Sequence, residues 1–409
     1  MKLLFSVDHR FEIGADGAVY TLGGKYPYRL WQEYLEAFDE VVVVCRGGPM
    51  TSPIERLSLS SGSRVRHVPV GGRRGVKRLS ELANLQKTLA PLVLASDAVV
   101  ARLPGELGSA ACDLARRNER PYLAEVVASA WDALWGHGSL AAKAYAPILE
   151  HRTAKVVARA PLARYVTEAF LQKAYPTAGR TFVASNVALA PIDSGVAVDR
   201  DARIRSTPSP LVFGTIGSLV SRMKGVHTAL EALAAQRNSL PPFLYHVLGE
   251  GDPAPYRALA ERLGLSSQVR FDGVLPAGPA VMAWLDGVDI YLQPSFQEGL
   301  PRALIEALSR GCLAAASTAG GTPELLPPAR LHRPGDVTQL GRLILDVATQ
   351  SLEDSLSESR ENMRTAQRYD GAHLAMKRRE SVAALANLVS NRGRNASANV
   401  DAPSALKEL

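Results

Sequence analysis

The sequence has few cysteines, few aromatic residues and no long apolar run. Its three cysteines, Cys45, Cys112 and Cys312, lie far apart without metal-ligand spacing, so they favour a reducing compartment over a disulfide framework. We therefore expect a cytoplasmic protein. Nowhere do eighteen apolar residues follow one another, and the apolar run in "MKLLFSVDHRFEIG" is too short for a secretory signal. The sequence predicts neither a membrane span nor export.

Positive charge is unevenly distributed along the chain. The formal net charge is +7; residues 1–190 contain 24 Lys and Arg against 17 Asp and Glu, whereas residues 191–409 contain 23 of each. Part of the surplus lies in "RVRHVPVGGRRGVKR", Arg64 to Arg78, which could face anionic lipid or acidic glycan, or form a solvated loop. Nucleic acid is not an expected partner, because neither interleaved aromatic residues nor a known binding module accompanies this charge.

The order of apolar runs predicts two α/β domains. Strand-like and helix-like segments alternate from the start of the chain, stop at a Pro-, Ser- and charge-rich stretch, and then start again. We expect two doubly wound, mainly parallel sheets, each able to bind a ligand beyond the carboxyl ends of its strands. The predicted units are a first domain (1–190), a linker (191–208), a second domain (209–358), closing helices (359–389) and a disordered tail (390–409).

Two glutamates flank a predicted helix start in "SFQEGLPRALIEALSRG". Pro301 suits the first position of a helix, which places Glu298 in the preceding loop and Glu306 about a turn and a half into the helix. Backbone amides around Gly299 and Leu300, at the positive end of this helix, would favour a diphosphate or sugar oxygens. A helical glutamate facing a cleft can accept hydrogen bonds from both hydroxyls of a ribose. Two ordinary surface acids would give the same spacing.

A cationic turn precedes an earlier predicted helix in "GTIGSLVSRMKGVHTALEAL". Gly217 follows a strand and allows close approach of a ligand, while Arg222 and Lys224 stand just before Gly225 and the helix. The two cations could neutralise a pyrophosphate leaving group. The turn is neither a Walker loop nor a dinucleotide fingerprint, since both of those glycine patterns are absent.

These motifs together resemble a known family. The order "GSLVSRMKG", "LGEGD", "VRFDGVL" and "PSFQEGLPRALIEALSRGCLAAASTAGGTPELL" resembles the retaining GT-B glycosyltransferases of family 4, the group 1 glycosyltransferases, over nearly all of residues 208–345. The resemblance in residues 1–190 is weaker and rests on a Gly-Gly loop and the strand order. It implies a GT-B fold, with two Rossmann-like doubly wound domains facing across a cleft.

The resemblance also implies site roles. Glu298 would contact the donor sugar, Arg222 and Lys224 would hold the diphosphate, and Glu306 would bind the donor ribose. The first three are therefore the catalytic candidates. Val274 and Leu275 would flank the base, and Gly23 and Gly24 fit either a glycine loop beside the phosphates or an ordinary turn. The donor-binding set implied in this way is Glu306, Gly217, Gly299, Leu300, Val274, Leu275, Gly23 and Gly24.

Two departures from the family pattern affect the expected site. Ser218 stands where the family commonly has an arginine, and we expect Arg222 to substitute for it. The N-domain histidine of many members is missing from "PYLAEVVASAWDAL", and His137 comes too late to replace it. Glu125 and Asp132 are the candidate acceptor-side groups. Activity tolerates this loss if the leaving phosphate itself takes the acceptor proton, which leaves positioning and charge stabilisation to the protein.

The expected activity is transfer of a hexose, with retention, from a nucleoside-diphosphate sugar to a glycan or lipid-linked acceptor in bacterial surface polysaccharide biosynthesis. No metal or other cofactor is expected, because cations and helix ends hold the donor in this family. The basic first domain could contact anionic lipid at the inner face of the membrane. Alternatives are a UDP-sugar 2-epimerase, which needs further acid/base residues, and a non-catalytic nucleotide-sugar-binding protein. A periplasmic binding protein is disfavoured because no export signal is expected.

Overall fold

The structure is a computed structural model that describes residues 1–22, 25–70, 77–135, 140–187, 189–207 and 209–400. Its strands are β1 (Lys2–Ile13), β2 (Val19–Leu22), β3 (Glu40–Pro49), β4 (Leu57–Leu59), β5 (Val65–Pro69), β6 (Ala98–Leu103), β7 (Tyr122–Val126), β8 (Leu162–Tyr165), β9 (Arg180–Val183), β10 (Leu211–Ile216), β11 (Phe243–Leu248), β12 (Val269–Gly273), β13 (Ile290–Gln293), β14 (Leu313–Ser317) and β15 (Leu331–His332).

The helices alternate with these strands. They are α1 (Tyr28–Leu35), α2 (Lys77–Leu94), α3 (Glu106–Arg117), α4 (Ala130–Trp135), α5 (Leu140–Ala158), α6 (Phe170–Ala174), α7 (Ser194–Arg205), α8 (Val226–Gln236), α9 (Ala254–Arg262), α10 (Pro279–Asp286), α11 (Arg302–Ser309), α12 (Val337–Thr349), α13 (Leu352–Gln367) and α14 (Gly371–Val400). Short 3₁₀ turns are η1 (Ile54–Arg56), η2 (Arg222–Lys224), η3 (Thr322–Glu324) and η4 (Pro328–Arg330).

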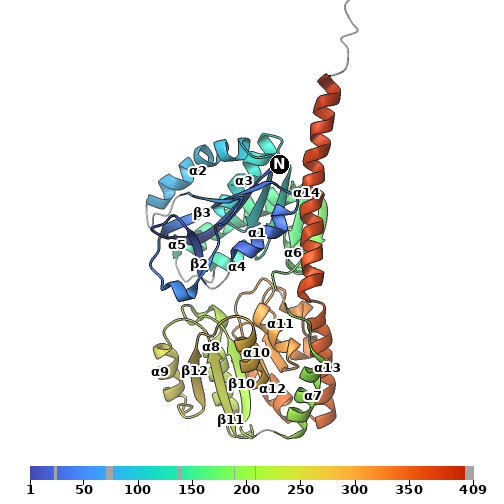
Figure 1. The fold of residues 1–409 in the computed structure, drawn as a ribbon. Helices are drawn as coiled ribbons and strands as arrows, with labels where there is room; N and C mark the ends of the chain where they lie inside the picture. The colour runs from blue at the N-terminus through green and yellow to red at the C-terminus, as the bar shows by residue number, and fades with distance from the viewer. Residues whose placement is uncertain (23–24, 71–76, 136–139, 188, 208, 401–409) are drawn as a thin grey trace, which may run out of the picture.

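The first sheet is built from strands β1 to β9. Parallel strands lie in the order β5–β3–β1–β6–β7–β8–β9, and β2 and β4 add an antiparallel extension to the end of β1. Runs such as "LLFSV" and "VVVVC" are apolar almost throughout because helices cover both faces of the sheet. Helices α1 and α14 pack on one face, and α2, α3 and α5 pack on the other (Figure 1).

The second sheet is fully parallel over the described residues. Its order is β12–β11–β10–β13–β14–β15. Helices α8, α9 and α12 cover one face, and α10, α11 and α13 contribute to the cluster on the other face. Both sheets are therefore doubly wound, which confirms the predicted α/β class with two Rossmann-like units.

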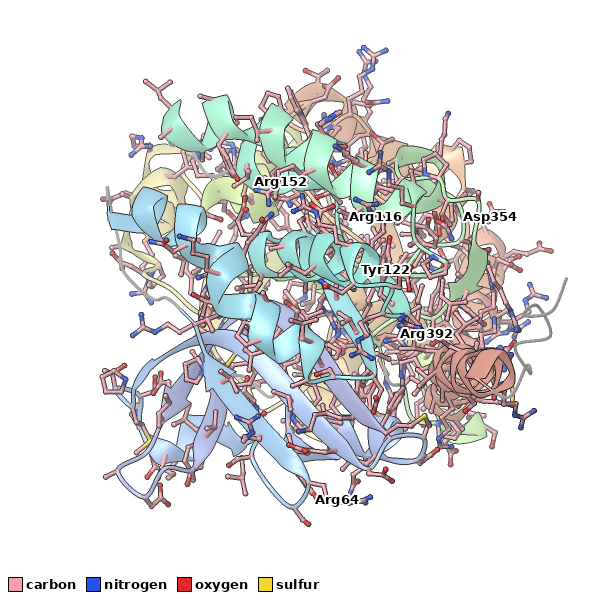
Figure 2. The ribbon with its side chains drawn as sticks, turned by 90° about the horizontal axis from the view of Figure 1, so that it is seen from above. Arg64, Arg116, Tyr122, Arg152, Asp354 and Arg392 are labelled. Carbon is pink, nitrogen blue, oxygen red and sulfur yellow. The ribbon has the colours of Figure 1, made fainter. Side chains whose placement is uncertain are left out.

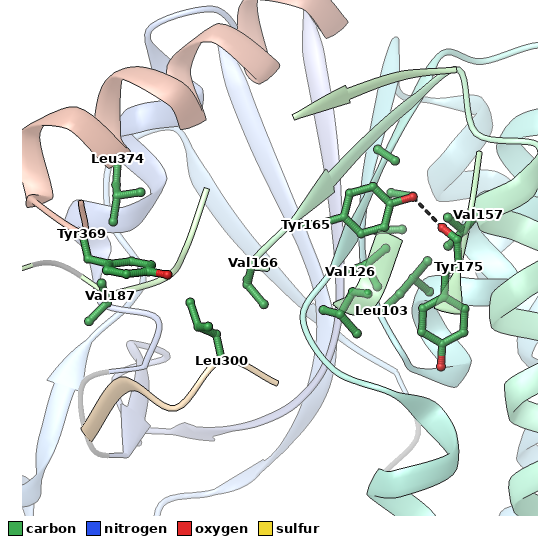
Figure 3. Close-up of a cluster of buried hydrophobic side chains, with 14 of the residues drawn as sticks. Leu103, Val126, Val157, Tyr165, Val166, Tyr175, Val187, Leu300, Tyr369 and Leu374 are labelled. Carbon is green, nitrogen blue, oxygen red and sulfur yellow. Dashed lines mark hydrogen bonds between the residues drawn. The ribbon is translucent and has the colours of Figure 1, made fainter. Parts of the chain in front are cut away.

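An apolar cluster joins the two domains. The side chain of Leu300, from the loop before α11, is buried among Val166, Val187, Tyr369 and Leu374 (Figure 3). Those four residues come from the end of the first domain and from the segments that lead into and out of the second. The glutamate-bearing loop therefore packs against the region where the chain passes between domains.

The predicted linker at 191–208 is wrong in one respect, because it contains the twelve-residue helix α7. The helix has no periodic apolar face by which its sequence could have predicted it, and the residue that it buries is the polar Arg200. Its guanidinium is buried and donates to the carbonyl oxygens of Arg310 (2.7 Å), Val288 (2.7 Å) and Leu285 (3.1 Å). This helix is attached to the second domain by hydrogen bonds to carbonyls at the ends of other elements.

The C-terminal helices also differ from expectation. Helix α13 begins at Leu352, before the predicted 359, and packs on α11 and α7 of the second domain. Helix α14 returns to the first domain, where Arg378 forms two 2.8 Å hydrogen bonds to Glu33 of α1 (Figure 1). The prediction of disorder from 390 is wrong for residues 390–400, whose polar sequence continues α14, with Arg392 donating to Glu119. Residues 401–409 lie outside the described chain.

Candidate functional site

The candidate site lies at the topological switch point of the second sheet. Strands β11 and β12 extend from β10 in one direction, and β14 and β15 extend from β13 in the other. A crevice beyond the carboxyl ends of two such adjacent strands is the usual ligand position in doubly wound sheets. The segments that follow β10 and β13 are the two that carry the predicted motifs.

Two glycines position the cationic turn after β10. A Cβ at Gly217 would lie 2.8 Å from the Cβ of Lys224, so the lysine stem rests against bare backbone. Gly225 ends η2 with φ 69°, and a Cβ there would lie 1.9 Å from the carbonyl oxygen of Pro294. Glycine is required at 225 by both its left-handed conformation and this close approach. The turn is thereby held against the end of β13.

Lys224 and Glu298 meet beyond the ends of β10 and β13. The Nζ atom of Lys224 lies 2.7 Å from Oε1 of Glu298, and Nε2 of Gln293 donates to the same oxygen at 2.8 Å. Glu298 is 8% exposed, whereas about a third of the Lys224 side chain is open. The two predicted residues, 74 positions apart in sequence, thus form one charged unit at the strand ends.

Arg222 supplies a second cation beside this unit. It is exposed, and its side chain makes no hydrogen bond or ion pair with a described residue. Burial, and then the charge of Arg222, lower the pKa of His227 to about 4. His227 stacks on Phe296 with ring centroids 5.5 Å apart. Arg222 therefore lies next to the start of α8 with its charge available for an anion.

Glu306 lies on the same edge of the sheet. Burial raises the pKa of its carboxyl group, partly offset by Arg302, and the carboxylate has no hydrogen bond or ion pair within the described chain. Burial, with smaller contributions from the charges of Glu298 and Glu306, raises the pKa of Tyr291 well above its ordinary value. Both carboxylates follow β13, one in the loop after it and the other in α11, so they lie at the same edge of the sheet.

The loop between the two glutamates is closely packed. A Cβ at Gly299 would lie 2.2 Å from the carbonyl oxygen of Val127 in the first domain, and one at Gly320 would lie 2.0 Å from that of Glu298. Gly321 donates its backbone N–H to the carbonyl of Gly299 at 2.7 Å. Together with the buried side chain of Leu300, these contacts fix the backbone that was predicted to face the donor phosphates.

The other predicted donor contacts lie further out. Val274 is 66% exposed and Leu275 is partly buried, directly after the edge strand β12. They are open to a flat ligand that extends across the strand ends. Gly23 and Gly24 lie outside the described residues.

Glu125 does not face a cleft, which corrects its choice as an acceptor-side candidate. It is 2% exposed in β7, with Arg102 at 3.3 Å and Arg164 at 3.1 Å. Burial acts to raise the pKa of Glu125, but the two arginines outweigh it and the pKa is lowered. The short strand "YLAEV" is buried at every position and gives no sign of this arrangement, because the partners come from β6 and β8. Glu125 neutralises the interior of the first domain.

Asp132, the second acceptor-side candidate, is partly buried at the start of α4. Burial and the neighbouring Glu150 raise the pKa of its carboxyl group, while a hydrogen bond from Ser129 lowers it. Its position at the end of the segment after β7 is compatible with an acceptor-side role, which stays a prediction.

Two functional residues were missed from the sequence. Gln293 ends β13 and hydrogen-bonds Glu298, and the only signal was a polar residue at the end of the buried run "IYLQ". Glu324 of η3 accepts backbone N–H bonds from Glu168 (2.6 Å), Ala169 (3.0 Å) and Phe170 (2.8 Å) in the first domain. Nothing in "GGTPELL" indicates that this carboxylate reaches across the domains to the start of α6.

Two features are absent from the described part of the chain. Among the described residues, no group of three or more His, Cys, Asp and Glu side chains could hold a metal ion. Within the same ranges, no helix combines the length and apolar character needed to span a bilayer.

Sequence relatives match this arrangement. Residues 200–369 match the family model described as Glycosyl transferases group 1. Protein CapJ of Staphylococcus aureus is 28% identical over 366 residues, which cover 89% of this chain and 91% of that protein. Lipopolysaccharide glucosyltransferase WaaG of Escherichia coli is 32% identical over 145 residues, covering 33% of this chain and 37% of its own length.

Solved structures share the whole fold. Anabaena HepE in complex with UDP aligns with a TM-score of 0.62 and 18% identity, over 94% of this chain and all of that one. A WaaG structure aligns with a TM-score of 0.58 and 19% identity, over 93% of this chain and 99% of that one. The chain has the GT-B fold, and the comparisons support its assignment as a group 1 glycosyltransferase.

Proposed function

We propose that the protein transfers a hexose from a nucleoside-diphosphate sugar to a hydroxyl of a glycan or lipid-linked acceptor, with retention, in surface polysaccharide biosynthesis. The observation that carries the proposal is the Lys224–Glu298 pair at the switch point, with Glu306 on the same edge lacking a partner among the described residues. HepE, which shares the fold, was solved with UDP and with UDP-glucose. WaaG, named as a lipopolysaccharide glucosyltransferase, and WcaL, named as a putative colanic acid biosynthesis glycosyltransferase, extend the sequence support toward surface polysaccharide synthesis.

Each charged group has a distinct part in this reaction. Arg222 and Lys224 neutralise the donor diphosphate, and Glu306 accepts hydrogen bonds from the ribose hydroxyls. Glu298 accepts a hydrogen bond from a hydroxyl of the donor sugar. The bond between C1 and the diphosphate oxygen breaks with its electron pair going to that oxygen. The acceptor oxygen bonds to C1 from the same face, and its proton passes to the leaving phosphate. The protein positions the donor sugar and neutralises the charge of the leaving diphosphate, and the reaction requires no metal ion.

The test measures sugar release and transfer by purified protein with UDP-glucose, GDP-mannose and ADP-glucose. We expect one donor to be turned over and Glu298→Ala to reduce the rate by about 100-fold or more. Binding of a nucleotide without turnover in either form would indicate a sensor, and isomerisation of the sugar at C2 would indicate an epimerase. Activity that is lost in EDTA and restored by Mg²⁺ would contradict the assignment of the diphosphate to Arg222 and Lys224.

A lipid-linked acceptor requires a surface that meets the membrane. Helix α5 exposes Leu140 (83%) and Ile148 (52%). In Figure 2, Arg152 of the same helix and Arg64, at the start of the basic stretch, lie on opposite sides of the molecule. We expect co-sedimentation with vesicles to require phosphatidylglycerol if the basic stretch carries the contact. Loss of vesicle binding in the double variant Leu140→Ser/Ile148→Ser would assign the membrane contact to α5 instead. If the wild-type protein does not co-sediment with any vesicle, the membrane contact is refuted.

A further inference from the structure

The buried groups behind Glu298 form a continuous hydrogen-bond chain. The backbone N–H of Ile216 donates to the hydroxyl oxygen of Tyr291 at 3.1 Å, and the Tyr291 hydroxyl donates to Oε1 of Gln293 at 3.1 Å. Nε2 of Gln293 then donates to Oε1 of Glu298 at 2.8 Å and to Oγ of Ser295 at 2.7 Å. Tyr291 and Gln293 are at most 1% exposed. Their hydrogen bonds are therefore made within the protein.

The direction of the chain follows from its two ends, a backbone N–H that can only donate and a carboxylate that can only accept. The N–H of Ile216 can only donate, so the tyrosine oxygen accepts from it and the tyrosine proton points elsewhere. Two acceptors are within reach of that proton, Oε1 of Gln293 at 3.1 Å and the carbonyl oxygen of Ile216 at 3.5 Å. The shorter contact is to Gln293, whose amide presents its oxygen to Tyr291 and its NH₂ to Glu298. The reversed amide would place an oxygen against a carboxylate in a buried site, which is repulsive. The Glu298 carboxylate therefore selects the orientation of the Gln293 amide, and the Tyr291 hydroxyl, which accepts from Ile216 at the end of β10, matches it by donating to the amide oxygen.

The carboxylate of Glu298 is oriented by this amide together with Lys224. Both groups donate to Oε1, and Oε2 makes no hydrogen bond to any residue in the described ranges. An ionised carboxylate accepts at both oxygens, so Oε2 is the atom left for a ligand hydroxyl. Lys224 alone cannot hold this geometry during a reaction in which it also binds diphosphate, because its ammonium group rotates freely on a flexible stem.

We propose that Gln293 is a positioning residue, set by Tyr291, that keeps Glu298 oriented toward the donor sugar when Lys224 turns to the diphosphate. The inference rests on the proposed function. It adds that the geometry of the sugar contact is set by two neutral side chains of β13 that do not touch the substrate.

The test compares Gln293→Met, which keeps the length of the side chain and removes the donor, with the wild-type protein. We expect kcat for donor hydrolysis to fall about 10- to 100-fold, because a charge-assisted hydrogen bond is lost. The dissociation constant of free UDP, or of the nucleoside diphosphate of the donor that is turned over, should change less than about twofold, because Glu298 contacts the sugar. Equal losses of nucleotide affinity and kcat would indicate a merely structural role and overturn the proposal.

Tyrosine variants give a matched control. Tyr291→Phe removes the hydroxyl that sets Gln293, whereas Tyr245→Phe removes an equally buried hydroxyl that bonds Thr215 at 2.9 Å. We expect kcat to fall several-fold in the first variant and to stay near wild type in the second, with similar decreases in melting temperature. Equal effects on kcat would contradict the proposal.

A structure of the Gln293→Met variant would show the orientation of the Glu298 carboxylate directly. The Glu298 carboxylate should rotate away from its wild-type orientation, while an unchanged carboxylate overturns the inference even if no donor is turned over. Wild-type protein that binds no nucleotide and releases no sugar would instead refute the proposed function.

Discussion

The two domains share one architecture but use their charged groups differently. At the strand ends of the first sheet, Asp8 pairs with Arg46 at 3.0 Å, and Glu106 pairs with Arg152 at 2.6 Å. Glu125 lies between two further arginines. In the second domain, by contrast, Arg222 and Glu306 have no charged partner within hydrogen-bonding distance among the described residues. The second domain also has internal ion pairs, such as Arg330 with Glu358 at 2.8 Å, so the difference lies in the two charged groups at its strand ends that remain unpaired within the described ranges.

The family model and the match to CapJ differ in extent, since the CapJ match covers 89% of this chain. Matches to the family model cover residues 200–369, whereas the fold extends over nearly the whole chain. A ligand shared by many enzymes constrains the residues that bind it, while an internal ion pair can be replaced if its partners change together. The comparison therefore predicts that charge removal costs stability in the first domain and activity in the second.

The largest expected effect is on the stability of the first domain. Glu125→Ala leaves Arg164, which is 1% exposed, without its ion-pair partner. Removing one partner of such a buried pair costs about 3–5 kcal/mol of unfolding free energy. Urea denaturation measures the loss. Glu119→Ala, at an exposed pair with Arg392, should cost less than about 1 kcal/mol. Wild-type stability of Glu125→Ala with a selective loss of acceptor use would restore its predicted acceptor-side role.

The second expected effect is on catalysis. Lys224→Met removes a cation that contacts Glu298 and faces the proposed diphosphate. We expect kcat/KM for the donor to fall about 100- to 1,000-fold, the usual cost of removing a preorganised charge-stabilising group. The loss of stability should be smaller than for Glu125→Ala, since the lysine is partly exposed. Lys173→Met, an exposed position on α6, is the control and should keep wild-type kinetics. Wild-type kinetics in Lys224→Met would show that Lys224 does not bind the diphosphate.

The third expected effect concerns Glu306, whose replacement should weaken nucleotide binding and at the same time stabilise the fold. Burial raises the pKa of Glu306, so its ionised form destabilises the fold, and this cost grows as pH rises above the ordinary glutamate range. Glu306→Gln should therefore raise the melting temperature at pH 7, with the gain shrinking toward pH 4. Loss of the charged acceptor should weaken nucleotide binding about 10- to 100-fold. Calorimetry of UDP binding and melting curves across pH measure both. Unchanged nucleotide affinity would exclude the ribose contact.

The meeting of Lys224 and Glu298 in the second domain could be predicted because both follow neighbouring strands. Gly217 and Lys224 follow one strand, and Glu298 and Glu306 follow another, so strand order alone brings them to one edge. The role of Glu125 in the first domain could not be predicted from the sequence, because its two arginine partners come from two other strands. Helix α7 was missed since Arg200 attaches it through carbonyl oxygens rather than through an apolar face. Long-range polar contacts leave no periodic signal in a sequence.

The smallest expected effect concerns the contact between the domains. Glu324→Ala removes a carboxylate that accepts three backbone N–H bonds at the start of α6, and the loss of such a cap costs about 0.5–2 kcal/mol. Asp336→Ala is the control, because its side chain caps α12 within the second domain at 2.8 Å. Both variants should lower the unfolding free energy by similar amounts. Only Glu324→Ala should broaden the domain arrangement in small-angle scattering, since its carboxylate joins the two sheets. Identical scattering from both variants would show that Leu300 and its apolar neighbours hold the domains without Glu324.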